Sequence, residues 1–306
     1  MISPPAPDAA RPHRSGRVAV VGRPNVGKST LLNRLVGQKI SITSRKPQTT
    51  RQPVTGIVTL DGAQIAIVDT PGYQNEHGGA LNRALNRAVA GGLQGLDAVV
   101  WVVEALAFDR RDEAVERLLP RSVPVVVAIN KCDRVRNRDE LLPFIGAIAE
   151  RREYAAIVPI SAAKGLYLDT LLGAVVPLLP EGPPVHGADE ITTANERFLA
   201  AELLREKLFE QLGDELPYSS AVEIEQFREE KGLRRIGATI LVDKPGHKAI
   251  VIGAGGTRLK SIATRARRDM EALFGGKVFL EVWVRVRRGW TENGPALKRM
   301  GFDSDS

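Results

Sequence analysis

Residues 22–29 read Gly-Arg-Pro-Asn-Val-Gly-Lys-Ser and directly follow the apolar run Val18–Val21. A helical pattern, Ser29–Val36, comes next and ends at Gly37, a residue that often terminates helices. A glycine-containing loop between a short apolar strand and a helix is typical of the first unit of a parallel α/β sheet. This stretch therefore predicts a mostly parallel sheet covered by helices.

Short apolar runs alternate with helical patterns through the first 180 residues. We expect strands at Val18–Val21, Val54–Leu60, Gln64–Val68, Ala98–Val103, Val125–Ile129 and Ile157–Ile160. The dipeptide Asp61-Gly62 separates the second and third runs and is typical of a tight hairpin. We therefore expect helices on both faces of the sheet and one antiparallel strand within it.

The pattern changes after residues 177–188, which contain four prolines and two glycines. A helix is expected at Asn195–Leu212, followed by strands near Ala221–Phe227 and Arg235–Val242, a glycine-rich turn, a long helix and a last strand. We predict a disordered tail at residues 1–16, a first domain at 17–184, a linker at 185–194, and an α+β domain with a C-terminal tail at 195–306.

Composition limits the class of protein. No run reaches the ~18–20 apolar residues of a membrane-spanning helix, and Met1–Gly16 lacks the apolar core of a signal peptide. The single cysteine, Cys132, excludes an intramolecular disulfide and favours the reducing cytoplasm. The net charge is +7, and Lys248–Arg299 holds 12 Lys and Arg against 4 Asp and Glu. An anionic partner, either nucleic acid or a membrane surface, is expected for this basic region.

The opening loop fits the pattern G-x-x-x-x-G-K-[ST] of phosphate-binding loops. Its backbone N–H groups would surround phosphate, Lys28 would reach the β and γ oxygens, and the Ser29 hydroxyl would bind Mg²⁺. The N-terminus of the following helix favours the same anion. The residues expected to bind nucleotide here are Gly22, Arg23, Pro24, Asn25, Val26, Gly27, Lys28, Ser29 and Thr30.

Three further motifs follow predicted strands in order. Asp69-Thr70-Pro71-Gly72 offers a carboxylate for Mg²⁺ and, at Gly72, an N–H group for the γ-phosphate. Asn130-Lys131-Cys132-Asp133 offers a carboxylate that accepts from both N1–H and N2–H₂ of guanine, a donor pair that adenine lacks. Ser161-Ala162-Ala163-Lys164 brings backbone to the guanine O6. Asn130 would donate to the base, and Lys131 would lie along its face.

Together these four motifs resemble the G1, G3, G4 and G5 boxes of Ras-like GTPases. Pro47-Gln48-Thr49-Thr50-Arg51 occupies the switch I place, where either Thr49 or Thr50 would complete the Mg²⁺ shell. Catalytic contributions are expected from Lys28, Thr49, Thr50 and Gly72. Tyr73 stands where Ras-like enzymes carry a water-orienting glutamine, so slow intrinsic hydrolysis is expected. By resemblance to related GTPases that lack this glutamine, Asn25 would help to bind K⁺.

The loop Gly253-Ala254-Gly255-Gly256 lies before the long helix and resembles the GXXG loop of KH domains, which binds single-stranded nucleic acid through its backbone. Arg258 and Lys260 add charge beside it. The order of elements is that of the type II KH fold. Ala254 stands where that family often carries lysine, which implies weaker phosphate binding by the loop.

From the first loop to Arg288-Gly289-Trp290 and Leu297, the chain resembles the Era family of translation-factor-class GTPases; only residues 1–16 fall outside the resemblance. The resemblance implies GTP and GDP with Mg²⁺ as ligands, binding to the 3′ end of small-subunit (16S) ribosomal RNA, and a part in 30S subunit assembly and maturation. It also implies a monomer in the cytoplasm with peripheral association with the inner membrane. The alternative is a membrane-associated signalling GTPase whose basic C-terminal face docks on lipid.

We expect GTP and Mg²⁺ to order the loops around Thr49–Thr50 and Gly72–Tyr73, and so to change how the KH face is presented. Metal and triad enzymes find no support in the sequence. The four histidines, His13, His77, His186 and His247, are scattered, and no G-x-S-x-G motif occurs.

Overall fold

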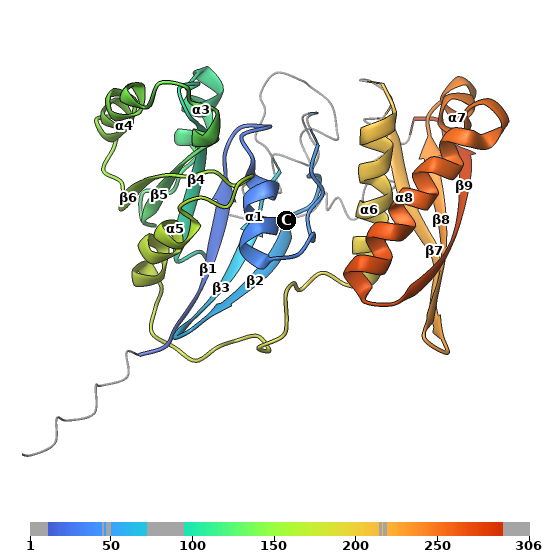
Figure 1. The fold of residues 1–306 in the computed structure, drawn as a ribbon, viewed down its shortest axis with the longest axis horizontal. Helices are drawn as coiled ribbons and strands as arrows, with labels where there is room; N and C mark the ends of the chain where they lie inside the picture. Colours follow the sequence, from blue (N-terminus) through green and yellow to red (C-terminus); the bar gives the residue numbers. More distant parts are fainter. Residues whose placement is uncertain are drawn as a thin grey trace, which may run out of the picture.

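The computed structural model describes residues 12–44, 46, 50–71, 95–213, 216 and 219–289. The chain forms two domains, one around a six-stranded sheet and the other around a three-stranded sheet (Figure 1). The first spans residues 14–178, and the second begins at helix α6. This agrees with the predicted α/β domain followed by an α+β domain.

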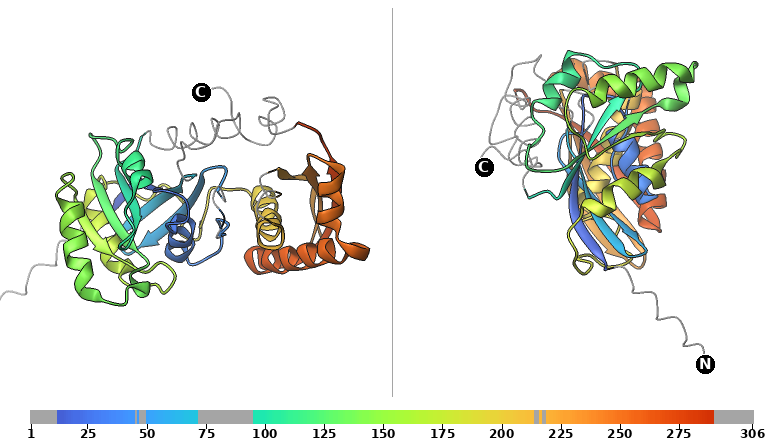
Figure 2. Two further views of the ribbon diagram at one scale, coloured as in Figure 1. Left: turned by 90° about the horizontal axis from the view of Figure 1, so that it is seen from above. Right: turned by 90° about the vertical axis from the view of Figure 1, so that its left-hand side faces the viewer.

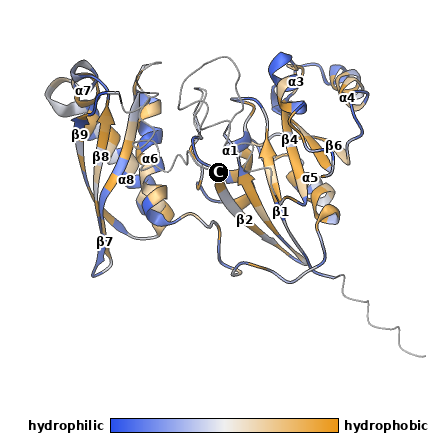
Figure 3. Cartoon of the chain, turned by 180° about the vertical axis from the view of Figure 1, so that it is seen from behind, coloured by the Kyte–Doolittle hydropathy of each residue, from blue (hydrophilic) through white to orange (hydrophobic). Residues whose placement is uncertain are grey.

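The six-stranded sheet has the order β2-β3-β1-β4-β5-β6. Its strands are β1 (Arg14–Val21), β2 (Val54–Leu60), β3 (Ala63–Asp69), β4 (Ala98–Glu104), β5 (Val125–Asn130) and β6 (Ala156–Pro159). Strand β2 pairs antiparallel with β3, and all other pairings are parallel. The prediction of one antiparallel strand in a parallel sheet is confirmed. The strands are apolar along most of their length (Figure 3).

Helices cover both faces of this sheet, as predicted. The helices are α1 (Lys28–Val36), α3 (Arg110–Glu116), α4 (Leu141–Ala149) and α5 (Leu168–Val175), with 3₁₀ turns η1 (Cys132–Arg134), η2 (Arg138–Glu140) and η3 (Val176–Leu178). Leu31 of α1 and Leu171 of α5 share one core with alternate residues of β1 and β4. Val115 of α3 and Ile148 of α4 share the other core with the remaining alternate residues. Each strand therefore buries side chains on both faces, which explains its continuous apolar run.

The predicted boundary of the N-terminal tail at residue 16 is wrong. Strand β1 begins at Arg14, and residues 14–16 pair with Ala63–Ile65 of β3. The Arg14 N–H donates to the carbonyl of Gly62 at 3.0 Å. No apolar pattern marks these residues, because the far ends of the two strands are held by backbone hydrogen bonds.

The linker is fastened to the first domain by one buried side chain. Gln64 Oε1 accepts from the N–H groups of Val185 and His186, both at 2.8 Å, and its Nε2 donates to the carbonyl of His186 at 2.9 Å. Gln64 is only 1% exposed. The first residues of the predicted linker therefore lie along the six-stranded sheet.

The linker is held a second time near its end. Ile57 N–H donates to the carbonyl of Ile191 at 2.9 Å, and the Thr192 hydroxyl donates to the carbonyl of Thr55 at 2.6 Å. Thr192 thus lies beside the edge strand β2. Helix α6 begins only a few residues later, capped by the side chain of Asn195.

The second domain packs its helices on one face of its sheet. Its elements are α6 (Glu196–Gln211), β7 (Ser220–Glu230), β8 (Leu233–Val242), α7 (Pro245–Ile252), η4 (Ala254–Gly256), α8 (Thr257–Phe274) and β9 (Lys277–Val286). The strand order is β7-β8-β9, with β9 parallel to β8. Val278 and Val284 face the helices, whereas Phe279 and Trp283 are exposed on the other face. Figure 2 shows α6 and α8 side by side against this sheet.

Among the helices of the described residues, none combines the length and apolar character that crossing a membrane requires.

Candidate functional site

The loop of residues 22–27 connects β1 to α1 and curls tightly. Asn25 has a φ of 65° and Gly27 a φ of 105°, both in the left-handed region. A Cβ atom on Gly27 would lie 2.3 Å from Nδ2 of Asn130. Only glycine fits there, so the second glycine of the motif is required by the close approach of the strand β5 loop.

Lys28 extends back over this loop. Its Nζ donates to the carbonyls of Gly22 at 3.0 Å and Arg23 at 3.1 Å, and the residue is 6% exposed. Burial lowers the pKa of Lys28 to about 8, although the nearby Asp69 carboxylate opposes the shift. A buried ammonium group at the N-terminus of a helix is suited to hold an anion.

Four oxygen-bearing side chains meet beside Lys28. Ser29 Oγ donates to Asp69 Oδ2 at 2.7 Å and lies 3.0 Å from the Thr50 hydroxyl, and Ser41 Oγ donates to Asp69 Oδ2 at 2.8 Å. Asp69 Oδ1 is buried with no protein partner. Burial raises the pKa of Asp69, while Lys28 lowers it. An unsatisfied buried carboxylate oxygen among hydroxyls fits the oxygen ligands that Mg²⁺ prefers.

The other two motifs lie next to each other at the carboxyl ends of β5 and β6. Asn130 Nδ2 donates to the Val26 carbonyl at 2.7 Å, and its Oδ1 accepts from the Ala162 N–H at 2.9 Å. Asp133 Oδ1 accepts from the Ser161 hydroxyl at 2.6 Å. Asn130 therefore ties three of the four motifs together, a use of its amide that the sequence did not predict.

Two acidic residues that the sequence analysis missed support these loops. Glu104, at the end of β4, pairs with Lys131 at 2.8 Å and with Arg23 at 3.3 Å. Asp112 is fully buried and accepts from Arg23 at 2.9 Å. Glu104 had a usable signal, because it follows an apolar strand at the same sheet edge as the motif residues. Arg23, Lys131 and these two carboxylates therefore hold the loops, rather than facing solvent.

The phosphate loop, the motif loops after β5 and β6, and Thr50 open on one cavity of about 1170 Å³, larger than the ~300–1,000 Å³ of common ligand pockets. Pro24, Asn25, Gly27, Lys28, Ser29, Thr30, Thr50, Asn130, Lys131, Asp133 and Ala163 line it, together with Thr43 and, from the second domain, Phe209 and Arg265. Asp69, Thr70 and Ser161 are buried behind this surface, and Pro71 and Cys132 lie in the same loops. The predicted residues Thr49, Gly72 and Tyr73 lie outside the described residues.

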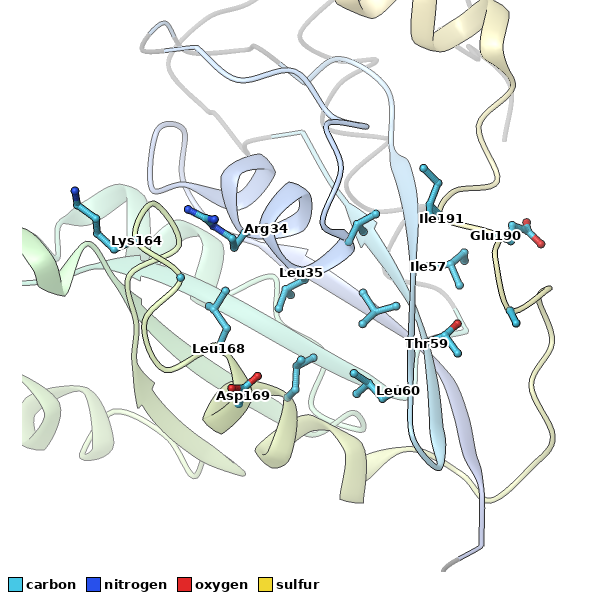
Figure 4. A pocket seen from close by; sticks show the side chains of 15 residues that line it. Arg34, Leu35, Ile57, Thr59, Leu60, Lys164, Leu168, Asp169, Glu190 and Ile191 are labelled. Carbon is cyan, nitrogen blue, oxygen red and sulfur yellow. The ribbon is translucent and has the colours of Figure 1, made fainter. Parts of the chain in front are cut away.

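A second cavity, of about 610 Å³, lies between α1, β2, α5 and the linker (Figure 4). Arg34, Lys164, Asp169 and Glu190 line it with apolar side chains of β2. Of the predicted nucleotide and RNA motifs, only Lys164, the last residue of the fourth nucleotide motif, lines this cavity. Most of the residues predicted to bind nucleotide therefore gather at the first cavity.

The glycine loop of the second domain lies between α7 and α8. Gly253, Gly255 and Gly256 have φ values of 74°, 56° and 78°, which favour glycine, whereas Ala254 is exposed between them. The Arg258 guanidinium donates to the carbonyl of Ile250 at 2.6 Å, and Lys260 is exposed. The loop thus presents open backbone at the start of the 18-residue helix α8, an arrangement suited to phosphate.

Comparisons with known proteins identify a family for each of the two domains. Residues 17–131 match the family described as 50S ribosome-binding GTPase, and residues 215–291 match the KH domain family. GTPase Era of Xanthomonas oryzae pv. oryzae (strain MAFF 311018) is 54% identical over 95% of this chain and 98% of its own length. The chain belongs to the Era family of GTPases. GTPase Era of Stenotrophomonas maltophilia (strain K279a) is 53% identical over the same shares of the two chains.

Solved Era structures share the whole architecture. Aquifex aeolicus Era Y63A bound to GDP.AlF₄⁻ has a TM-score of 0.91 and 38% identity, covering 94% of this chain and 99% of that one. Era in complex with MgGDPNP and nucleotides 1506–1542 of 16S ribosomal RNA also has a TM-score of 0.91 and 38% identity, covering 95% and 99%. As a member of the Era family, this chain is a GTPase that converts GTP to GDP and phosphate. When bound at such a site, Mg²⁺ neutralises charge on the β- and γ-phosphates.

Proposed function

We propose that this Era-family chain is a GTP-controlled switch that binds the 3′ end of 16S ribosomal RNA and acts in assembly and maturation of the 30S subunit. One observation carries the proposal: the described parts of all four nucleotide motifs lie close together, and the same chain has an open glycine loop of KH geometry. The Era complex with MgGDPNP and nucleotides 1506–1542 supports this choice of RNA. We place the protein in the cytoplasm, where ribosomes assemble.

The proposed roles follow from the geometry. Residues 22–30 bind the phosphates, with Lys28 on the β and γ oxygens, and Ser29, Thr50 and Asp69 bind Mg²⁺. Asp133 selects guanine with the backbone of Ser161–Ala163 beside it. Residues 253–256, with Arg258 and Lys260, bind the RNA backbone. Because positioning and charge neutralisation carry most of phosphoryl-transfer catalysis, slow intrinsic hydrolysis is consistent with this set.

The RNA proposal is tested with a short RNA that copies the 3′ end of 16S ribosomal RNA. Binding is measured by fluorescence anisotropy with GDPNP and with GDP, against a scrambled RNA, at two salt concentrations. We expect the GDPNP form to bind the true sequence more tightly. Equal binding of both RNAs with a steep salt dependence would mean only a basic surface, and binding to anionic vesicles would then support the membrane alternative.

Gly255→Asp is expected to weaken RNA binding by about ten-fold or more, because it puts a carboxylate where phosphate lies. Aspartate tolerates the left-handed φ of 56°, and nothing lies within 4 Å of the new Cβ. Gly232→Asp is the matched control, since its φ is 75° and its surroundings are equally open, but it lies in the β7–β8 turn. Loss of GTP binding in the Gly255→Asp variant would contradict the two-domain assignment.

We also propose that Asn25 helps to bind K⁺ beside the phosphates. Its left-handed φ of 65° in the phosphate loop and its place on the nucleotide cavity support this. Hydrolysis is expected to be about ten-fold faster in potassium than in sodium at equal ionic strength, because a positioned cation stabilises developing charge. Asn25→Ala should remove the difference in a phosphate-release assay. Equal turnover of the unchanged protein in both salts would contradict the proposal.

A further inference from the structure

A buried carboxylate of the second domain holds the loop that follows α1 in the first. Glu206 lies on α6, which faces that loop, and is 1% exposed (Figure 1). Its Oε1 accepts from Thr43 N–H at 2.9 Å and from the Thr43 hydroxyl at 3.3 Å. Its Oε2 accepts from Lys39 Nζ at 2.5 Å and from Lys207 Nζ at 2.9 Å. Three of these four donors come from the first domain, the G domain.

The charged group extends to helix α8. Lys207 Nζ lies 2.7 Å from Asp269, and Lys39 Nζ lies 2.9 Å from the same Asp269 oxygen. Burial lowers the pKa of Lys207, but its hydrogen bonds to Asp269 and Glu206 outweigh this and raise the pKa above its ordinary value. Lys207 therefore keeps its charge at neutral pH, and each member of the group depends on the others for compensation.

The loop held by Glu206 is part of the nucleotide site. Thr43 lines the nucleotide cavity, and Ser41, two residues earlier, donates to Asp69. Thr50 lies beside Ser29. The described residues 41–43 thus lie between Asp69, a predicted Mg²⁺ ligand, and the carboxylate of Glu206.

A second contact between the domains involves Arg51. The Arg51 guanidinium donates to the carbonyl of Ser220 at 2.9 Å and lies 5.9 Å from the ring of Phe209. Arg51 is only 4% exposed and is the residue after Thr50. The second domain therefore contacts described residues on both sides of residues 45–49: Lys39 and Thr43 before them and Arg51 after them.

We propose that Glu206 is a positioning residue for the nucleotide site, by which the KH domain holds the described residues 39–44 of the loop after α1 beside the Mg²⁺ ligand Asp69. When these residues move away, Glu206 loses Lys39 and both groups of Thr43 but stays on the buried face of α6, which disfavours the displaced state. A bound γ-phosphate with Mg²⁺ would favour the held state through Thr50 and Asp69. Binding of the γ-phosphate and docking of the KH domain therefore favour each other reciprocally. This inference does not depend on which RNA the KH domain binds.

The test compares nucleotide affinities rather than activity. Glu206→Gln keeps the shape of the side chain but removes the charge that two ammonium groups require. With Mg²⁺ present, we expect the affinity for fluorescent GDPNP to fall about ten-fold, within the usual range of coupling between sites. Affinity for fluorescent GDP should change less than about two-fold, because GDP lacks the γ-phosphate that would favour the held state.

The matched control is Glu202→Gln, one turn earlier on α6. Glu202 also pairs with a buried cation, Arg205 at 2.5 Å, but that partner is on its own helix. This variant should leave the ratio of GDPNP to GDP affinity unchanged. A loss shared equally by both nucleotides, or the same loss of GDPNP affinity in Glu202→Gln, would overturn the proposal.

Lys39→Met tests the same contact from the G domain and covers the case in which Glu206→Gln does not fold. The Lys39 side chain is 38% exposed, so its replacement is tolerated more readily. It should show the same selective loss of GDPNP affinity, and combining it with Glu206→Gln should add less than the sum of the single effects. Unchanged GDPNP affinity in Lys39→Met, or full additivity in the double variant, would refute a shared contact.

Discussion

Lys28→Met is expected to lower the affinity for both GTP and GDP by roughly 30- to 5,000-fold, the range for removing one partner of a buried charge pair. The ammonium group of Lys28 is buried and donates to the loop carbonyls of Gly22 and Arg23. Without it, phosphate oxygens would enter a buried loop with backbone N–H groups as their remaining donors.

The measurement is titration with fluorescent GTP and GDP analogues. Thermal unfolding without nucleotide serves as the test of folding, and methionine fills nearly the same volume, so the unfolding midpoint should change little. Lys277→Met is the control for charge, because Lys277 is exposed at the start of β9 and far from the cavity in sequence. Undiminished affinity of Lys28→Met for both nucleotides would show that this lysine does not bind the phosphates.

Asp133→Asn is expected to lower GTP affinity by about 10³- to 10⁴-fold, because an amide presents a donor to one of the two guanine donors. The same change should raise the affinity for xanthosine triphosphate, because its 2-oxo group can accept a hydrogen bond from the amide N–H of the asparagine. The hydrogen bond from Ser161 to Oδ1 at 2.6 Å fixes the orientation of this side chain.

Competition between the two nucleotides for the variant and the unchanged protein measures this switch. Asp139→Asn is a suitable control, since Asp139 is an exposed carboxylate in the nearby turn η2. A variant that loses both nucleotides equally would place Asp133 in loop folding rather than in base selection.

The core of the fold could be predicted because buried strands require runs of apolar residues that are visible in the sequence. Strands β4 and β5 and residues 65–68 of β3 are buried and form apolar runs, so the existence and order of these strands could be predicted. The start of β1 at Arg14 shows no such apolar run. Its first residues are held by backbone bonds to Ala63–Ile65, and backbone bonding does not select side chains.

The nucleotide motifs were predictable for a topological reason. Parallel strands end at one edge of the sheet, so motifs that each follow a strand must meet there. The order of these motifs along the chain therefore sufficed to place Lys28, Asp69 and Asp133 together.

Contacts between the domains were not predictable from local patterns. Glu206, Lys207 and Arg205 occur in a helix that reads as an ordinary charged helix, yet all three are buried. Nothing in their spacing indicates that Thr43, 163 residues before Glu206, is its hydrogen-bond partner. Such burial follows from how two domains meet, which single-segment patterns do not encode.

The fastening of the linker by Gln64 and Thr192 has a consequence for how the halves of the molecule meet. Only residues 193 and 194 connect Thr192 to Asn195, the cap of α6. At 3.3–3.6 Å per residue, this connection allows α6 to lie at most about 10 Å from Thr192. So short a tether keeps the effective concentration of each half around the other at the millimolar level or above. Lost contacts therefore re-form without a diffusional search, and a rearrangement of the two halves must be a swivel about this one point.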